Sequence, residues 1–349
     1  MKGGHIFHIG KMVIIMDIGI DLGTANVIIS VGNKGIVLNE PSVVAFSKKI
    51  DDVIAVGDEA YKMIGRTPDY ITVVRPLSDG VISDHKMTER MITAFIEKVT
   101  GKQLFMPSIV MCIPSSITDV ESRAVVEAAK IAGARQVYLI EEPVAAIMGA
   151  GVDISSPNGN MVVDIGGGTT DIAVISMNGV VAKSSLKIAG EKLNKAIVKY
   201  VSARYRILIG EKTAENAKMA AANVFSPDGS RRIVVKGRHL VRGLPEQIEL
   251  TDYDIYEALI DCVREMIDGA KNVFEKTPPE LVGDIYQNGI YLTGGGALLF
   301  GLDKLMSSEL GVKCNIADDP MSCVAKGTRY AFKYLDKLLD GFEHVSMYK

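Results

Sequence analysis

Apolar and small residues alternate along the segment MDIGIDLGTANVIIS, residues 16–30, with the period of two that predicts a β-strand. The alternation breaks at Asp21 and a Gly-Thr pair, and an apolar run resumes at Val27. The segment is therefore predicted to form a strand, a tight turn and a second strand. A carboxylate directly before the turn, where an apolar side chain could be buried, needs an explanation beyond packing.

A second segment, MVVDIGGGTTDIAVIS at residues 161–176, repeats this plan. An apolar strand, Asp164, a glycine-rich turn and another apolar strand follow in the same order. The pattern predicts two related halves, each beginning with a hairpin that has an acid before its turn. Two similar halves that face each other create a cleft.

Between the hairpins, the patterns predict an α/β lobe. Met87, Met91 and Phe95 fall on one face of a helix, and Thr118 with Glu121 has the spacing of a capping box that begins another. Strands are predicted in IVMCIP and QVYLI, and the proline of PVAAIMGAG opens a short helix.

The second half continues with the same alternation. Amphipathic helices are predicted at 193–205 and 253–274, on either side of a strand-rich insert around 231–250. GIYLTGGGALLFGLDKLMSSELG follows as strand, glycine turn and helix, and a last strand and helix complete the chain. Strands that alternate with helices predict sheets covered on both faces, in two lobes.

Length and composition agree with this plan. At 349 residues, the chain exceeds the usual size of one domain. The net charge of -3 argues against nucleic-acid binding, and the one basic stretch, RRIVVKGRHLVRG, is interpreted as a solvated hairpin. The scattered cysteines and histidines indicate buried thiols and no transition-metal site. No apolar run approaches the ~18 residues of a spanning helix, so we expect a cytosolic protein.

Three glycine-rich turns, DLGTAN, DIGGGTTD and LTGGGAL, stand at the ends of predicted strands. Glycine lets the backbone approach a ligand closely and adopt positive φ, so that successive N–H groups can converge on phosphate oxygens. For any one turn, an ordinary hairpin is an equal alternative. Three such turns together, two of them preceded by Asp, favour phosphate binding.

None of the turns matches the P-loop pattern G-x-x-x-x-G-K-[ST] or the dinucleotide fingerprint. Without a P-loop lysine, a divalent cation is needed to balance the phosphate charge. Asp21 and Asp164 are hard oxygen donors that suit Mg²⁺, bound through its water ligands. This role explains the acid before each turn.

Agreement with a known family extends from about Asp17 to Thr328. Besides both hairpins, it includes GIVLNEPSVVAF, RPLSDGVISD, IPSSITDVESRAVVEAAKIAGA, LIEEPVAAIMGAG, KTPPELVGDI, LTGGGALLFGLDKL and VAKGT. On these segments, the chain resembles the actin-like ATPase superfamily and, within it, the MreB family of bacterial cell-shape proteins. The resemblance implies an α/β actin-like ATPase fold with two duplicated lobes, divided into four subdomains around a nucleotide cleft.

The resemblance also implies subdomain limits. Subdomains IA and IIA would carry the hairpins, and the smaller IB and IIB would be insertions. The implied ranges are 17–44, 78–156 and 324–349 for IA, 45–77 for IB, 157–193 and 258–323 for IIA, and 194–257 for IIB. The leader, residues 1–16, is either a membrane-contacting segment or a disordered tail.

By the same resemblance, ATP would bind between the two hairpins. Glu215 and Lys218 would lie on its ribose and base side. Because these two are three residues apart on a predicted helix, a surface ion pair is the alternative interpretation. The other implied nucleotide-binding residues are Thr24, Ala25, Asn26, Gly166, Gly167, Gly168 and Thr169 for the phosphates, and Gly294, Gly295, Gly296 and Ala297 for the adenosine.

Glu142 matches the residue that positions the attacking water in this family, and Thr169 matches its partner. A carboxylate can accept a proton from water aimed in line at the γ-phosphate, while Mg²⁺ and backbone amides stabilise the charge. Capping of the helix after Pro143 is the alternative role for an acid here, and it fits Glu141 better. Relatives commonly have Glu where this chain has Asp171.

Three function classes share such an ATP-binding core. A heat-shock chaperone would need a substrate-binding domain, and too few residues follow Thr328. A non-polymerising, sugar-kinase-like phosphotransferase remains the alternative, although no acceptor pocket is assigned. The resemblance favours an ATPase that forms filaments with copies of itself and acts with the cell-wall elongation machinery to set cell shape.

Leu104 and Phe105 lie in TGKQLFMPS, between a predicted helix and a predicted strand. The pair is either packed under the helix or available to an apolar partner. The residues alone favour burial, whereas the resemblance favours insertion into membrane lipid, with Lys98 and Lys102 attracted to anionic headgroups. The protein would then be peripheral, at the cytoplasmic face of the membrane.

Overall fold

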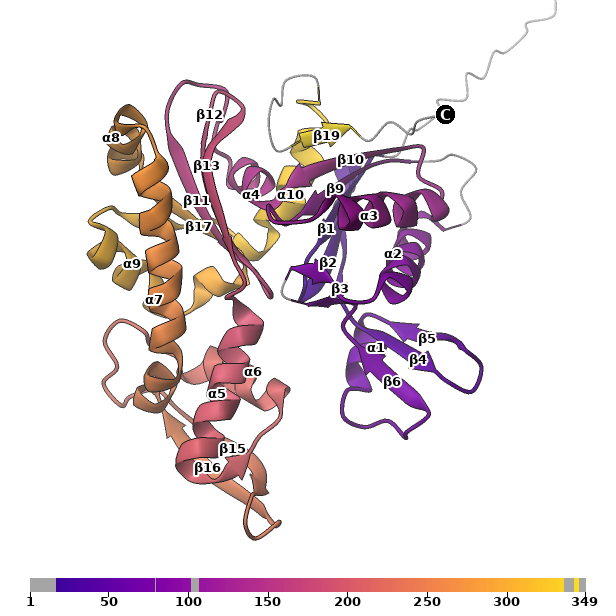
Figure 1. Cartoon of the computed structure of the whole chain (residues 1–349), viewed down its shortest axis with the longest axis vertical. Coiled ribbons are helices and arrows are strands. Elements are labelled where there is room, and N and C mark those ends of the chain that lie inside the picture. Colours follow the sequence, from indigo (N-terminus) through magenta and orange to yellow (C-terminus); the bar gives the residue numbers. More distant parts are fainter. Residues whose placement is uncertain (1–16, 79, 102–106, 336–341, 345–349) are drawn as a thin grey trace, which may run out of the picture.

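The computed structural model describes residues 17–78, 80–101, 107–335 and 342–344, which form two lobes side by side (Figure 1). Each lobe contains one main sheet. In spatial order, the first sheet comprises β19 (Phe342–His344), β10 (Gln136–Glu141), β9 (Ser108–Ile113), β1 (Asp17–Leu22), β2 (Asn26–Val31) and β3 (Gly35–Pro41). The second comprises β13 (Gly179–Leu186), β12 (Thr170–Ser176), β11 (Asn160–Ile165), β17 (Ile290–Thr293) and β18 (Cys314–Ile316).

The two main sheets repeat one topology. Strand β1 pairs antiparallel with β2 and parallel with β9, and β11 pairs antiparallel with β12 and parallel with β17. Asp21 lies opposite Ile28 in the first hairpin, and Asp164 lies opposite Asp171 in the second. The predicted repeat of two hairpins, each with an acid near the end of its first strand, is confirmed.

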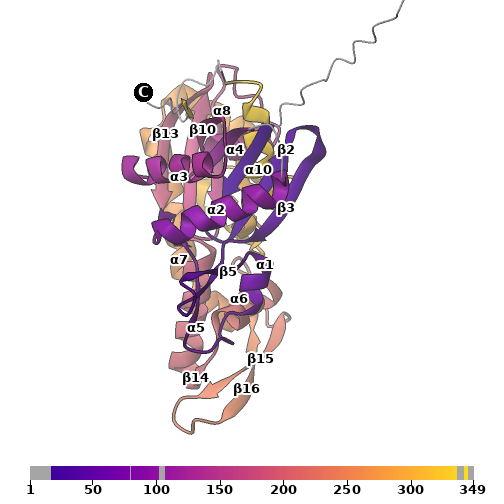
Figure 2. The ribbon, with the colours of Figure 1, turned by 90° about the vertical axis from the view of Figure 1, so that its right-hand side faces the viewer.

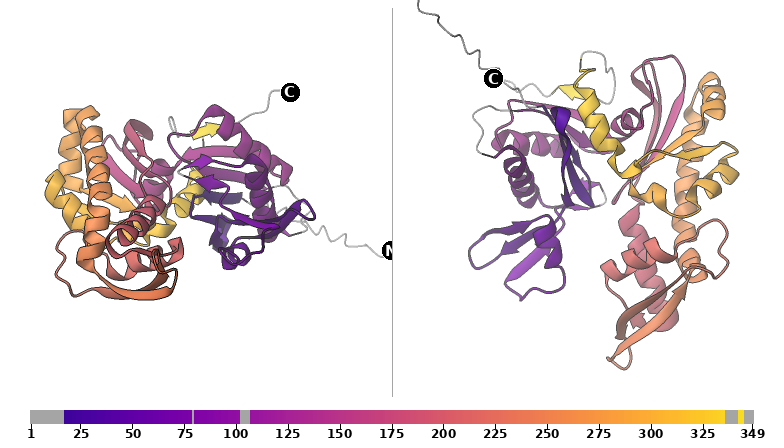
Figure 3. Two further views of the ribbon diagram at one scale, coloured as in Figure 1. Left: turned by 60° about the horizontal axis from the view of Figure 1, so that its bottom comes forward. Right: turned by 180° about the vertical axis from the view of Figure 1, so that it is seen from behind.

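Helices cover both faces of each main sheet, because their apolar stripes are buried against the strands. The outer helices of the first lobe are α2 (His85–Thr100) and α3 (Asp119–Ile131), which begins with the predicted capping box. Those of the second lobe are α7 (Asp252–Lys276), α8 (Pro279–Asn288) and α9 (Leu302–Leu310). Two helices lie between the sheets, α4 (Glu142–Gly149) and α10 (Cys323–Ala331), as seen from behind in Figure 3.

The middle helices form a joint between the lobes. A single cluster of buried residues includes side chains of both main sheets and of α4 and α10. A Cβ atom on Gly149 would lie 1.7 Å from the carbonyl oxygen of Cys323, so the two helices approach at a distance that glycine allows. The lobes are therefore packed tightly against each other at this joint.

Each lobe carries a small sheet below its main sheet, as the side view shows (Figure 2). The first consists of β5 (Asp52–Val56), β4 (Val44–Ser47) and β6 (Ile71–Val74), with α1 (Asp58–Lys62). The second consists of β14 (Ile207–Leu208), β15 (Arg232–His239) and β16 (Pro245–Thr251), with α5 (Gly190–Tyr205) and α6 (Glu211–Ala221). The remaining elements are β7 (Leu77–Ser78), β8 (Val81–Ile82) and the 3₁₀ turns η1 (Gly32–Lys34), η2 (Gly295–Leu298) and η3 (Pro320–Ser322).

The strand-rich insert expected around 231–250 is confirmed as the hairpin β15–β16. The predicted subdomain limits stay predictions. Within the described part of the chain, no helix has the length and apolar character needed to cross a membrane.

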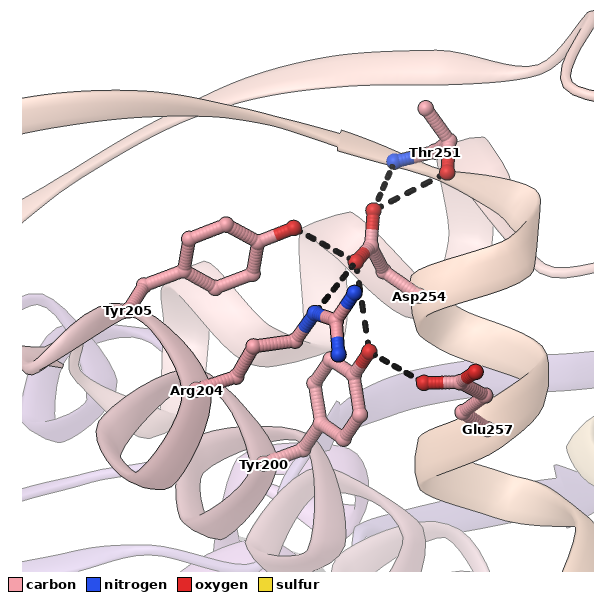
Figure 4. Close-up of polar contacts among 6 residues, drawn as sticks. All are labelled: Tyr200, Arg204, Tyr205, Thr251, Asp254 and Glu257. Carbon is pink, nitrogen blue, oxygen red and sulfur yellow. Dashed lines mark hydrogen bonds and ion pairs between the residues drawn. The ribbon is translucent and has the colours of Figure 1, made fainter.

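A polar cluster around Asp254 joins the end of α5 to the start of α7 (Figure 4). The Asp254 carboxylate accepts hydrogen bonds from the N–H and hydroxyl of Thr251, both at 2.9 Å, in a capping box. The hydroxyl of Tyr205 donates to its other oxygen at 2.6 Å, and the hydroxyl oxygen of Tyr200 lies 3.3 Å from that oxygen. One buried acid therefore holds three segments of the lower second lobe together.

Candidate functional site

A cavity of about 680 Å³ lies between the two lobes and is lined by residues of both. Its volume is in the range of small-molecule and cofactor sites. The predicted site residues that line it are Asp21, Thr24, Ala25, Asn26, Glu142, Asp164, Gly166, Gly167, Gly168, Thr169, Glu215, Lys218, Gly294, Gly295 and Gly296. Ala297 is instead fully buried in the core of the second lobe. Leu104 and Phe105 lie outside the described residues.

The first two glycine-rich turns lie face to face across the cavity. A Cβ atom on Gly167 would lie 2.6 Å from the Cβ of Ala25, and one on Gly168 would lie 2.5 Å from the hydroxyl oxygen of Thr24. Any side chain at these glycines would push the turns apart. Glycine therefore allows the backbones of both hairpins to form opposite walls of one site.

Backbone hydrogen bonds hold the second turn against α5. The N–H of Gly166 donates to the carbonyl of Thr169 at 2.9 Å and closes the turn. The N–H groups of Gly190 and Glu191 donate to the carbonyls of Gly166 and Gly167, at 3.2 and 2.8 Å. The first turn of α5 is therefore fixed to the glycine turn.

The third turn packs directly on the end of β11. Gly294 has a φ of +77°, and a Cβ atom on it would lie 2.3 Å from the carbonyl oxygen of Ile165. A Cβ atom on Gly296 would lie 2.2 Å from the side chain of the same residue. These close approaches require glycine and place the third turn next to the second.

The two acids before the turns are close enough to affect each other. Burial and the charge of Asp164 raise the pKa of Asp21 to about 8. Burial raises the pKa of Asp164 to about 7, although a 2.6 Å hydrogen bond from the Thr293 hydroxyl opposes the rise. A neighbouring cation would therefore stabilise both ionised carboxylates. No group of three His, Cys, Asp or Glu side chains in the described ranges could hold a metal ion.

Glu142 and Asp171 form a second buried acidic pair. Glu142 is 7% exposed and Asp171 is fully buried. Burial, followed by the charge of Asp171, raises the pKa of Glu142 well above its usual range. Asp171 also accepts a hydrogen bond from the N–H of Ser115 at 3.2 Å, which favours its ionised form. The pair is therefore expected to share one proton.

Glu141 does not cap the helix that follows it. It occupies the N-cap position of α4 but makes no side-chain capping hydrogen bond. Its carboxylate instead lies 2.7 Å from the Nζ of Lys183 on β13. The capping prediction is wrong because the ammonium group is a charged partner, and such hydrogen bonds are stronger than neutral ones.

Glu215 and Lys218 belong to the cavity wall rather than to the outer surface. The Nζ of Lys218 donates to the carbonyl of Gly190 at 3.1 Å, next to the second glycine turn. Burial lowers the pKa of Lys218, and the charges of Glu215 and Glu191 oppose this shift. The arrangement places one acid and one base on the lower side of the cavity.

Further residues line the cavity that the sequence motifs did not assign to the site. They come from segments of different lobes that meet only in the folded chain, so no local spacing could reveal them. The Nε of Arg75, for example, lies 3.7 Å from Oε1 of Glu191 in the other lobe. The main residues of this kind are Tyr61, Arg75, Glu191, Lys212, Arg231 and Phe300.

Comparison with known proteins extends these observations. The family model for the MreB/Mbl protein matches residues 15–340. The cell shape-determining protein Mbl of Bacillus subtilis (strain 168) is 52% identical over 323 residues, which cover 92% of this chain and 97% of Mbl. The cell shape-determining protein MreB of Escherichia coli (strain K12) is 47% identical over 326 residues, which cover 92% and 94% of the two chains.

Solved structures show the same likeness. MreB5 of Spiroplasma citri bound to ADP superimposes with a TM-score of 0.88 at 37% identity, covering 93% of this chain and 98% of MreB5. The AMPPNP-bound form of that protein gives a TM-score of 0.86 at 36% identity, with the same coverage. The MamK double helical filament, at 20% identity and a TM-score of 0.77 over 91% and 98% of the chains, supports the fold alone. The predicted actin-like fold is thus confirmed, and the chain belongs to the MreB/Mbl family.

Proposed function

We propose that this chain binds ATP with Mg²⁺ between its lobes, hydrolyses it and assembles into filaments with copies of itself. The observation that carries the proposal is the face-to-face arrangement of two glycine turns, each preceded by an Asp, in a cavity of suitable volume. A related MreB5, 36% and 37% identical in its two structures, binds AMPPNP and ADP.

The phosphates would lie between the turn at 24–26 and the turn at 166–169, where backbone N–H groups can meet phosphate oxygens. The adenosine would lie along the third turn, at Gly294, Gly295 and Gly296. Glu215 would accept hydrogen bonds from the ribose hydroxyls, and Lys218 would lie toward the base. This placement uses all three glycine turns for one ligand.

The donor set fits Mg²⁺. Asp21 and Asp164 offer hard carboxylate oxygens, and their raised pKa values mean that a nearby positive charge would stabilise their ionised forms. Bound Mg²⁺ would neutralise part of the phosphate charge. We assign the two aspartates to holding the ion through its water ligands.

Hydrolysis would depend on Glu142 and Thr169, which line the same cavity. Bound Mg²⁺ would offset the charges of Asp164 and Asp21, which help to raise the pKa of Glu142, and would so favour the ionised form of Glu142. The ionised carboxylate would then orient a water molecule and accept its proton, and the Thr169 hydroxyl would help to hold that water. Asp171, buried and hydrogen-bonded to Ser115, would fix the carboxyl group of Glu142. In this proposal, Asp21 and Asp164 hold the ion, and Glu142 and Thr169 hold the water.

Family membership supports the proposed biological role. Relatives that are 47% and 52% identical are named cell shape-determining proteins. We propose the same role for this chain: filaments, held at the cytoplasmic face of the membrane through Leu104 and Phe105, that organise cell-wall synthesis with the elongation machinery. Head-to-tail contacts between copies that do not close into a ring would build such a filament.

Sedimentation with and without Mg-ATP tests this function. We expect pelleted protein to appear above a critical concentration with Mg-ATP, and phosphate release to rise steeply with protein concentration. The same samples with EDTA are the control. Monodisperse protein at all concentrations, together with phosphate transfer to a sugar, would contradict the filament and favour the phosphotransferase.

A further inference from the structure

Two side-chain contacts join the lobes at the cavity. The Nζ of Lys212 on α6 lies 4.8 Å from the centroid of the Tyr61 ring on α1, a cation–π distance. The Nε of Arg75, which directly follows β6, lies 3.7 Å from Oε1 of Glu191 in the first turn of α5. All four side chains line the cavity. Each contact therefore has one partner in each lobe.

The partners in the first lobe are held by that lobe. Tyr61 packs against the small buried cluster that includes Ala60. The backbone carbonyl of Arg75 accepts a hydrogen bond from the Ser83 hydroxyl at 3.2 Å. Both side chains therefore start from a backbone that belongs to the packed part of the first lobe.

The partners in the second lobe are held in the same way. The N–H of Glu191 donates to the carbonyl of Gly167, in the second glycine turn, at 2.8 Å. Lys212 stands on α6, whose residues Ala214 and Ala217 are buried in the core of the second lobe. Because each partner stays with its own lobe, neither contact can persist when the small parts of the lobes separate.

These contacts and the joint lie on different sides of the cavity. The joint helices contribute Glu142 of α4 and Val324 of α10 to the cavity wall. Figure 1 shows α4 and α10 between the main sheets, whereas α1, α5 and α6 lie below them. The joint is closely packed at Gly149, where a Cβ atom would lie 1.7 Å from the carbonyl oxygen of Cys323. The lower side, which is joined by side chains, is therefore the side that can open.

Both contacts have the strength of a reversible closure. The side chains of Arg75 and Glu191 are 28% and 15% exposed, and their N–O distance exceeds that of an ordinary hydrogen bond. Lys212 is exposed to solvent. A partly exposed ion pair and a solvated cation–π contact each contribute little free energy, so both can break and form again without unfolding either lobe.

We propose that these two contacts form a clasp, defined by Tyr61, Lys212, Arg75 and Glu191, that must open before a nucleotide enters or leaves the cavity. The clasp regulates the rate of nucleotide exchange rather than the affinity, because one opening step precedes both entry and exit. The inference rests on the proposed function, which places ATP and ADP in this cavity. It adds that replacement of ADP by ATP requires the small parts of the lobes to separate.

The test measures a rate and an affinity with Mg-ADP, at protein concentrations below those that pellet. The dissociation rate comes from a chase of radiolabelled ADP with excess unlabelled ADP, and the affinity comes from isothermal titration calorimetry. We expect Lys212→Met and Arg75→Gln each to raise the dissociation rate about threefold, the scale of one exposed cation–π contact or ion pair. The affinity should change by less than about twofold, because the association rate rises as well.

Combined variants show whether the two contacts act together. The double variant Lys212→Met/Arg75→Gln should release ADP about tenfold faster than the wild type, because the effects of separate contacts multiply. Glu191→Gln added to Arg75→Gln should have little further effect, since the ion pair is already lost. Tyr61→Phe keeps the aromatic ring and should stay within about twofold of the wild-type rate.

Lys49→Met is the matched control. The Nζ of Lys49 lies 3.7 Å from the centroid of the Tyr70 ring, so this variant also removes a cation–π contact, but one within the first lobe. Neither residue is among the described residues that line the cavity. The dissociation rate and the affinity of this variant should equal those of the wild type.

A wild-type dissociation rate in Lys212→Met/Arg75→Gln would overturn the clasp, while normal ADP binding by the wild type would leave the proposed function standing. Faster dissociation with an equal loss of affinity would overturn the clasp as well, because these side chains would then bind the nucleotide directly. Wild-type protein that binds no ADP would overturn the proposed function itself, and the inference with it.

Discussion

A Cβ atom on Gly327 would lie 1.8 Å from the carbonyl oxygen of Ala145, so α10 crosses α4 at a distance that only glycine permits. The variant Gly327→Ala must push the backbones of the two middle helices apart. We expect it to lower the free energy of unfolding by about 3 kcal/mol, at the upper end of overpacking effects. Urea denaturation followed by circular dichroism measures the change.

Gly283→Ala provides the control for that measurement. Gly283 also lies within a helix, α8, but a Cβ atom there has no neighbour within 4 Å. Alanine at this position should be neutral or stabilise the protein by about 0.5–1 kcal/mol, because it reduces the entropy of the unfolded chain. Equal stability of the two variants would contradict the close crossing at Gly327.

Substitutions of Glu142 and Asp164 should have separate effects. Asp164→Ala removes a proposed ion-binding carboxylate and should weaken nucleotide binding when Mg²⁺ is present. Glu142→Ala should keep nucleotide binding but lower phosphate release by roughly 10²-fold or more, the scale of a positioned acid or base. Glu141→Ala, which changes the neighbouring acid paired with Lys183, is the control and should stay close to the wild type. Near-normal phosphate release by Glu142→Ala would exclude its catalytic role.

Replacement of Leu104 and Phe105 by serine tests the membrane prediction. We expect the double variant to lose co-sedimentation with anionic liposomes while it keeps nucleotide binding, because a filament that displays the pair at every subunit binds by avidity. Lys98 would add less to the predicted attraction to anionic headgroups than its sequence position suggests, since its ammonium group pairs with Glu40.

Two outcomes would count against this anchor. Unchanged lipid binding would assign it to another part of the chain, with residues 1–16 as the next segment to test. A large fall in melting temperature would instead favour the alternative in which Leu104 and Phe105 are packed under the helix. Circular dichroism melts of both proteins separate these cases.

Asp254 should make the second lobe sensitive to acid. Burial alone would raise the pKa of Asp254, but hydrogen bonds from Tyr205 and Thr251 outweigh it and lower the pKa below its usual value. A carboxyl group with a lowered folded-state pKa contributes stability above its unfolded pKa, and this contribution is lost as the pH falls through the folded pKa. The Asp254→Asn variant should thus be about 2 kcal/mol less stable at pH 7, the scale of hydrogen bonds to a charged group.

The stability difference between Asp254→Asn and the wild type should stay constant above about pH 5 and shrink as the pH falls below about 4, from the unfolded-state pKa of an aspartate toward the lowered folded-state pKa. Glu257→Gln is the control, because Glu257 is exposed and accepts a hydrogen bond from the same Tyr200, at 2.6 Å. Its effect should stay within about 0.5 kcal/mol, as for most surface changes. A difference for Asp254→Asn that does not vary with pH would contradict the assignment.

The sequence patterns predicted those strands, turns and helices whose conformation depends on residues close together in the sequence. The hairpins around Asp21 and Asp164 follow from a period of two and a glycine turn, and the helix after Glu141 follows from a proline at its first turn. The role of Glu141 could not be predicted in this way, because its partner Lys183 is distant in sequence and only the packing of the lobes brings it close. Other cavity residues could not be predicted for the same reason: Tyr61 belongs to no motif, and Lys212, whose ammonium group lies over its ring, belongs to the other lobe.

The close packing of α4 against α10 also limits how the two lobes can move relative to each other. Tightly packed helices permit only small sliding or rotation. The joint lies between the main sheets, whereas the small sheets lie below them (Figure 1). A small rotation at Gly149 and Gly327 would therefore produce a larger displacement at the ends of the lobes that are farthest from this joint.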